Sequence, residues 1–119
     1  MNSPSAAPEE IDERTGRIRA LNDQLRTTFS GGQLFLTPGI RDLGEDGVMA
    51  VLDVVKEFDD FSEANDPHGE HDFGSFKHEG QTIFWKIDCY DKDLAYGSPD
   101  PTDPAVTSRV LTVLLSSEY

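Results

Sequence analysis

One ten-residue stretch, NDPHGEHDFG at residues 65–74, concentrates most of the side chains that could do chemistry. Its candidate ligands are His68 and His71, three positions apart, with Asp66, Glu70 and Asp72. Imidazole and carboxylate groups suit zinc or a harder divalent cation. The stretch has no helical His-Glu-x-x-His pattern, no cysteine pair and no EF-hand loop, so no cofactor is expected. A metal site on His71 and Asp72 is therefore an alternative interpretation only.

The same stretch could instead supply acid–base chemistry. His71 lies between Glu70 and Asp72, and Lys86 and Asp88 share one face of a predicted strand that a hairpin would bring close. A small hydrolase-like or metal-dependent enzyme centred on these five residues is the alternative function. The chain carries no nucleophile elbow, phosphate-binding loop or dinucleotide fingerprint.

A purely structural interpretation also accounts for residues 65–74. Asn65 and Asp66 would cap a turn that Pro67 and Gly69 shape, and His71 would hydrogen-bond to backbone in a half-buried loop. Under this interpretation the stretch positions the following strand and has no catalytic role.

Charge limits the possible partners. The chain has 23 acidic residues against 10 lysines and arginines, a net charge of −13. Eleven acidic residues lie between Asp42 and Asp72, against Lys56 alone. Such a field repels phosphate, which argues against direct binding of nucleic acid or an anionic membrane. It would attract a basic protein surface, or it could simply keep the chain soluble.

An acidic helix that runs into an acidic loop could imitate the charge of DNA, which carries about one phosphate per 1.7 Å of duplex axis. The expected partner is a basic host protein that itself binds nucleic acid, and binding would weaken with added salt. The residues expected to bind are Asp46, Asp53, Glu57, Asp59, Asp60 and Glu63.

The bulk properties predict one domain. At 119 residues a second core is not expected; residues 1–8 read as disordered and residues 9–119 as a single domain. There is no secretory signal pattern and no run of about 18 apolar residues that could span a bilayer. The lone Cys89 cannot form an internal disulfide, which favours a reduced, cytoplasmic protein.

Two helices are predicted. Residues 9–28 carry a thin apolar stripe of Ile11, Ile18, Leu21 and Leu25, which would pack on the domain or on a second copy in a homodimer. Residues 43–60 follow Asp42 and Glu45, spaced as a capping box. The stripe of this second helix is Val48, Val51, Leu52, Val55 and Phe58.

Four strands are predicted, near residues 33–37, 72–78, 82–90 and 108–115. In residues 82–90, Ile83, Trp85, Ile87 and Cys89 alternate with polar or aromatic positions, which indicates one buried face and a buried Cys89. This strand would pair with 72–78 as a hairpin around HEGQ. The last segment is rich in β-branched residues, so we prefer a strand although a helix from Asp103-Pro104 stays open. The fold class is then α+β, with a small, mostly antiparallel sheet and two helices.

Several motifs together resemble a family of small bacterial and phage proteins known only as a domain of unknown function. They are LTPGI, FDDFSEANDPHGEHDFGSF, FWKIDCYDKDL and the terminal GSPDPTDPAVTSRVLTVLLSSEY, and the resemblance covers about residues 17–119. The chain departs from the family pattern at His68, a variable position, and at Cys89, where the family has tyrosine. The matching positions are Asn65, Asp66, Pro67, Gly69, Glu70, His71, Asp72, Phe73, Gly74, Lys86, Asp88, Tyr90, Asp91, Thr107, Arg109, Thr112, Glu118 and Tyr119.

The resemblance implies a phage, plasmid or mobile-element setting but no activity. Combined with the charge pattern, it makes our leading hypothesis a non-enzymatic anti-defence inhibitor. Such an inhibitor, of the anti-CRISPR or anti-restriction kind, would block a basic nucleic-acid-binding host protein.

Overall fold

The computed structural model describes residues 12–119, so the prediction for residues 1–8 and the position of Ile11 lie outside the described part. Its elements run in the order α1 (Glu13–Thr28), β1 (Gln33–Leu36), α2 (Pro38–Arg41), α3 (Gly44–Glu57), β2 (Phe73–His78), β3 (Gln81–Tyr90), β4 (Ser108–Leu115) and a 3-10 turn, η1 (Ser116–Glu118). None of the helices in this part is long and apolar enough to cross a membrane.

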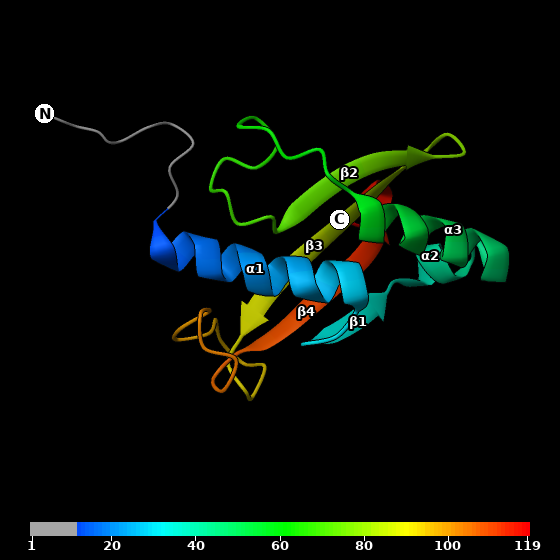
Figure 1. Cartoon of the computed structure of the whole chain (residues 1–119). Helices are drawn as coiled ribbons and strands as arrows, with labels where there is room; N and C mark the ends of the chain where they lie inside the picture. The colour runs from blue at the N-terminus through cyan, green and yellow to red at the C-terminus, as the bar shows by residue number, and fades with distance from the viewer. Residues whose placement is uncertain (1–11) are drawn as a thin grey trace, which may run out of the picture.

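The four strands form one sheet in the order β1-β4-β3-β2. β2, β3 and β4 pair antiparallel, and β1 lies parallel to β4 at one edge. Helices α1 and α3 both lie against the same face of this sheet (Figure 1). The α+β class and the mostly antiparallel sheet are therefore confirmed, and the ambiguous C-terminal segment is a strand.

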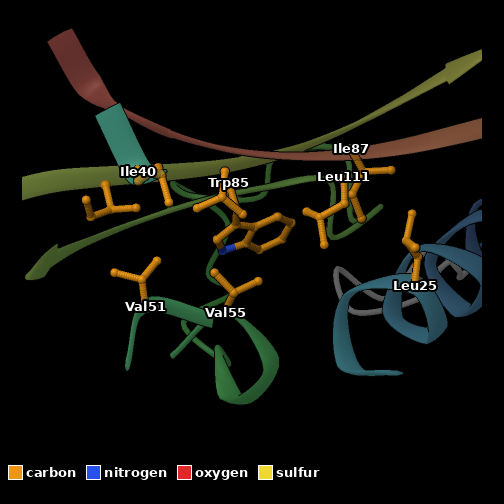
Figure 2. Packing of buried hydrophobic residues seen from close by; sticks show 9 residues of the cluster. Leu25, Ile40, Val51, Val55, Trp85, Ile87 and Leu111 are labelled. Carbon is orange, nitrogen blue, oxygen red and sulfur yellow. The ribbon is translucent and has the colours of Figure 1, made fainter. Parts of the chain in front are cut away.

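The core forms where the two helices meet the sheet. Trp85 of β3 is fully buried and points toward Val51 and Val55 of α3, with Ile40 and Leu111 beside it (Figure 2). Indole burial on this scale contributes much of the hydrophobic stabilisation of a small core. Trp85 is therefore a core residue.

The β2–β3 hairpin was predicted correctly because its alternation is strict. Ile83, Trp85 and Ile87 are buried while the residues between them are only partly so. The turn places both Glu79 (φ 50) and Gly80 (φ 85) in the left-handed region, as two-residue turns matched to strand twist require. Cys89 lies on the same face but is only half-buried, so the prediction of a buried cysteine was too strong.

The region before α3 corrects the sequence interpretation. Asp42 and Glu45 do not form a capping box: Asp42 ends the short helix α2, and Leu43 precedes α3 without a side-chain cap. Residues 38–41 form their own helical turn because Pro38 suits a first helical position and Ile40 is fully buried. Gly44, with φ of 82, then redirects the chain into α3.

Helix α3 ends at Glu57 and not at residue 60. Phe58 leaves the helix with an extended ψ of 130, and its ring packs edge-on against Trp85 at 5.4 Å between centroids. The aromatic contact requires the chain to turn toward the core there, which ends the helix.

The apolar stripe of helix α1 packs against the rest of its own chain. Ile18 and Leu25 are buried, and Asn22 and Arg26 are buried beside them. Burial of the two aliphatic residues within one chain leaves less of the stripe for a second copy. Dimerisation through this helix stays a prediction.

A glycine in β2 makes the packing of Trp85 possible. A Cβ added to Gly74 would overlap Trp85 Nε1 and lie 2.8 Å from Phe58 Cζ. We expect Gly74→Ala to lower the free energy of unfolding by about 1–3 kcal/mol, because an overpacked core must displace the indole or the strand. Urea denaturation would measure this loss. Ser75→Ala, at the adjacent exposed position, should change stability by less than about 0.5 kcal/mol; equal losses in both variants would contradict the proposed cause.

Candidate functional site

The stretch 65–72 is a set of turns that lies against helix α1. Arg19 Nε donates to the carbonyl of Gly69 at 2.7 Å, and Asn22 Nδ2 donates to that of Glu70 at 3.0 Å. Both donors belong to α1, almost fifty residues earlier in the chain. These two hydrogen bonds attach the backbone of the stretch to helix α1 without involving the side chains of the stretch.

His71 forms the centre of this attachment. Its ring stacks on Phe61 with 3.6 Å between centroids and 8° between planes. Nδ1 lies 2.9 Å from Asp23 Oδ1 and Nε2 lies 3.6 Å from Asp66 Oδ2. The backbone N–H of His71 donates to the other oxygen of Asp66 at 3.2 Å. The backbone of His71 itself is left-handed, with a φ of 54°. The side chain thus contacts two carboxylates. The structural interpretation of residues 65–74 had instead expected it to hydrogen-bond to backbone.

The contacts of His71 favour a structural role over a catalytic one. Both ring nitrogens face carboxylates, and one ring face is covered by Phe61. A general base needs a ring nitrogen that a substrate can reach. The geometry supports a histidine that ties the loop to α1, and neither nitrogen is directed at Lys86 or Asp88.

Arg26 extends the network to the end of α3. Its Nη2 pairs with Asp23 at 3.1 Å, the same carboxylate that contacts His71. Its Nη1 donates to three carbonyls at the C-terminal end of α3, those of Val55 (3.1 Å) and Lys56 (3.3 Å) within the helix and that of Phe58 (2.9 Å) just after it. The guanidinium also lies over the rings of Phe61 and Trp85. A single arginine therefore connects α1, α3 and the aromatic core.

The acid–base residues proposed from the sequence divide into groups. Glu70, Asp72 and Asp88 line a hollow of about 300 Å³ together with Cys89 and Arg14. Lys86 is not among the residues that line it; its Nζ donates to Asp88 Oδ2 at 2.6 Å, and this bond is the main cause that raises the pKa of Lys86. His71 faces Asp23 instead. Three of the five residues thus line the hollow, Lys86 is attached to one of them, and His71 lies apart.

Burial affects the acids of this hollow. It raises the pKa of Glu70, with the neighbouring charge of Asp72 as the second cause. It also raises the pKa of Asp72, partly opposed by a backbone hydrogen bond. Burial likewise raises the pKa of the Cys89 thiol, which leaves the sulfur a poor nucleophile at neutral pH. The raised pKa values of Glu70 and Asp72 are thus the acid–base feature of this hollow.

The raised pKa of Asp72 has a consequence for stability. Ionising this carboxyl costs more in the folded than in the unfolded chain, so stability falls as pH rises above the ordinary value of 3.8. We expect Asp72→Asn to raise the midpoint of thermal unfolding at pH 7, with the gain vanishing below pH 3.8. Asp93→Asn removes the same charge from an exposed loop position and corrects for net charge. A gain at pH 7 no larger than that of Asp93→Asn would contradict the assignment.

Metal ligands do not converge within residues 12–119. No group of three or more His, Cys, Asp or Glu side chains in this range is placed to hold a metal ion. His68 is exposed, and the nitrogens of His71 already face Asp23 and Asp66. Asp72 lines the neighbouring hollow, so His71 and Asp72 belong to no such group of ligands in the described range.

The six carboxylates proposed for partner binding occupy another surface. Asp46, Asp53 and Glu57 lie on the outer side of α3, spaced seven and four residues apart, and Asp59, Asp60 and Glu63 follow in the loop. All six residues are exposed, and none of the six forms an ion pair with another residue in the range 12–119. We call these six residues the acidic face.

An apolar side chain lies within the acidic face. Met49, three residues after Asp46 and four before Asp53, is 57% exposed. Val54, also on α3, is exposed to a lesser degree. Flexible methionine side chains suit contact surfaces, since they adapt to a partner's shape.

The residues that organise the loop were missed from sequence. Asn22 and Arg26 belong to the buried side of α1, at the spacing Ile18, Asn22, Leu25, Arg26. That i, i+4, i+7, i+8 pattern is the helical signal, but two of its members are polar and were therefore not included in the predicted apolar stripe. Polar residues at stripe positions could have identified them.

The comparisons with known proteins give a family and no activity. Residues 36–118 match one family, described as "Protein of unknown function (DUF3768)". The match includes α3, the 65–74 stretch and the β2–β3–β4 strands. No curated protein and no solved structure matches the chain.

Proposed function

The chain belongs to this family of unknown function, and we propose that it is a non-enzymatic binding module whose acidic face engages a basic surface of a partner protein. The observation that carries the proposal is the acidic face itself: six exposed carboxylates, from Asp46 to Glu63, none of which forms an ion pair within the described chain. Carboxylates that only balanced neighbouring lysines would be paired. These are available to an external cation.

The charge density of α3 determines how much of the acidic face a DNA-binding partner would have to contact. Helix α3 spans about 21 Å at about 1.5 Å per residue and carries four acids and one lysine. Its net charge density is then about one per 7 Å, against about one per 1.7 Å for duplex DNA. The helix alone is too weak a mimic of DNA. A partner that reads DNA-like charge must also contact the loop carboxylates of Asp59, Asp60 and Glu63.

Met49, the apolar residue within the acidic face, can add affinity that exposed carboxylates alone do not supply. Exposed ion pairs contribute little affinity, while an apolar anchor in a partner pocket contributes more. Met49 is placed to be that anchor, with Asp46 and Asp53 on either side. The proposed interface is therefore a methionine contact surrounded by salt-sensitive carboxylate contacts.

The partner class follows from this chemistry. We propose a basic nucleic-acid-binding protein, and in the setting that the sequence resemblance implies, a host defence effector that the chain blocks. Support for this role comes from the charge and exposure of the acidic face; the mobile-element setting is part of the proposal. The partner should lose nucleic-acid binding when the chain occupies its basic surface.

Affinity capture from host lysate at low and high salt tests the proposed function. We expect a basic nucleic-acid-binding protein to be retained at low salt, released at high salt, and displaced by excess DNA or RNA. Retention that is independent of salt, or that nucleic acid does not displace, would overturn the proposal.

The hydrolase-like alternative keeps one specific observation, the raised pKa values of Glu70 and Asp72 in their hollow. Since His71 and Lys86 do not line that hollow, the alternative narrows to three carboxylates, with Asp88 as the third. Hydrolytic turnover that Asp72→Asn abolishes would support it. A gain in stability without any such activity is the result that the binding function predicts.

A further inference from the structure

We propose that a second hollow, between α1, the start of β1 and the loop before β4, binds a small molecule carrying a phosphate or carboxylate group. The hollow has a volume of about 420 Å³, within the range of small-ligand sites. It is separate from the acidic face and from the hollow of Glu70 and Asp72, which share none of its lining residues.

The charges around this hollow are the reverse of those in the chain as a whole. Acids outnumber bases 23 to 10 in the sequence, yet the hollow is lined by Arg109 and Lys92 and by no carboxylate. Its remaining lining is neutral, including the amide side chains of Gln24 and Gln33 and the hydroxyl of Ser108. Two cations without an acid, joined by neutral hydrogen-bonding groups, are the chemistry of an anion site.

Arg109 is the stronger of the two cations. It is only 3% exposed, and no carboxylate in the described chain forms an ion pair with it. Its Nε donates to the amide oxygen of Asn22 at 2.8 Å and its Nη2 to the carbonyl of Pro101 at 2.5 Å. Both acceptors are neutral, so the guanidinium is fixed in position without an ion-pair partner, and the charge of Glu70 acts on it only from beyond ion-pair distance. A buried cation of this kind is costly unless an anion neutralises it.

The backbone that leads into β1 lies close to Arg109. A Cβ on Gly32 would lie 2.6 Å from the carbonyl oxygen of Arg109, so the glycine lets the chain after α1 lie directly on β4. Leu21 and Pro104 supply apolar walls. The site thus accepts one anionic group near the two cations and a compact, partly apolar body beside it.

The acidic surroundings of Lys92 do not close the site. Asp91 and Asp93 flank Lys92 in sequence, but neither lines the hollow. Asp91 Oδ1 is occupied, since it accepts the backbone N–H of Ala95 at 3.0 Å. The acidic helix α3 lies at the other end of the molecule from the 91–107 loop (Figure 1). Its charges are screened over that distance at ordinary ionic strength.

Backbone amide NMR titrations of the full chain test the proposal, with three probes used separately: inorganic phosphate, a nucleoside monophosphate and acetate. We expect saturable shifts at Gly31, Gly32 and Ser108 with at least one probe below about 10 mM. A response to both phosphate probes identifies the phosphate group as the ligand, a response to the nucleoside monophosphate alone identifies a phosphate ester, and a response to acetate alone identifies a carboxylate. No saturable shift with any of the three would overturn the proposal.

Matched variants separate the site from general charge. Lys92→Glu should weaken binding at least about tenfold, while Lys77→Glu, the same reversal on β2, should leave it within about twofold. Gln33→Glu places an acid at the hollow, and Gln81→Glu places one at the distant hairpin turn. All four residues are exposed, so folding should survive each change. Equal losses within either pair would contradict a local anion site.

Discussion

Replacing Arg26 with methionine should lower the free energy of unfolding by about 3–5 kcal/mol, the largest loss we expect from one substitution outside the apolar core. The residue is 4% exposed. Its removal takes a donor from the carbonyls of Val55, Lys56 and Phe58, of which Val55 keeps only a 3.4 Å bond from the Phe58 N–H. Asp23 loses its ion pair with the arginine and keeps its contact with His71. Each buried group that loses its partner retains its desolvation cost.

Urea denaturation with linear extrapolation measures this effect. Arg17→Met is the matched control, because Arg17 lies on the same helix and is exposed; it should change stability by less than about 0.5 kcal/mol. Arg26→Lys should fall between the two, since an ammonium cannot reach three carbonyls with a planar fork. A loss below about 1 kcal/mol for Arg26→Met would show that the arginine does not hold α1 to α3.

Reversing Asp53, Glu57 and Asp60 to lysine should weaken binding of the captured partner by about 100-fold or more, with the fold retained. Each reversal turns an attraction into a repulsion, and like charges at an interface cost several kcal/mol in total. The helix should tolerate the change, because the three positions are exposed and lysine is a good helix former. Lysine at Glu57, the last residue of α3, also suits the helix dipole.

The control for this variant carries an equal change in net charge elsewhere. Glu13, Glu79 and Asp93 are exposed and lie outside the acidic face, so their reversal to lysine alters the net charge identically. Circular dichroism would verify the fold of both triple variants. If both bind equally, affinity depends on net charge and not on the acidic face.

The strands were predictable from sequence to within about one residue. Period-2 alternation indicated the strand at 82–90, and β-branched composition indicated the one at 108–115. Short helix α2 was not, since four residues from Pro38 to Arg41 cannot show a helical period. The supposed capping box of Asp42 and Glu45 had the right spacing for a cap. It was wrong because Asp42 belongs to the end of that missed helix.

The role of His71 could not be predicted from its neighbours in sequence. The residue that decides it, Asp23, lies 48 positions earlier on α1. The adjacent carboxylates of Glu70 and Asp72 suggested catalysis, but they turn to a different hollow. Tertiary contacts of this range leave no local pattern. By contrast, exposure of the acidic face was predictable, since polar positions off an amphipathic stripe face solvent.

The most direct test of the acidic face uses its methionine. The chain has two methionines, Met1 and Met49, so a ¹³C-methyl-methionine sample gives few resonances, and Met49→Leu assigns the relevant one. On titration with the captured partner, we predict that the Met49 methyl resonance shifts or broadens in step with complex formation. The same resonance should not respond in the variant with Asp53, Glu57 and Asp60 reversed. A Met49 methyl that stays unchanged while the wild-type complex forms would contradict binding through the acidic face.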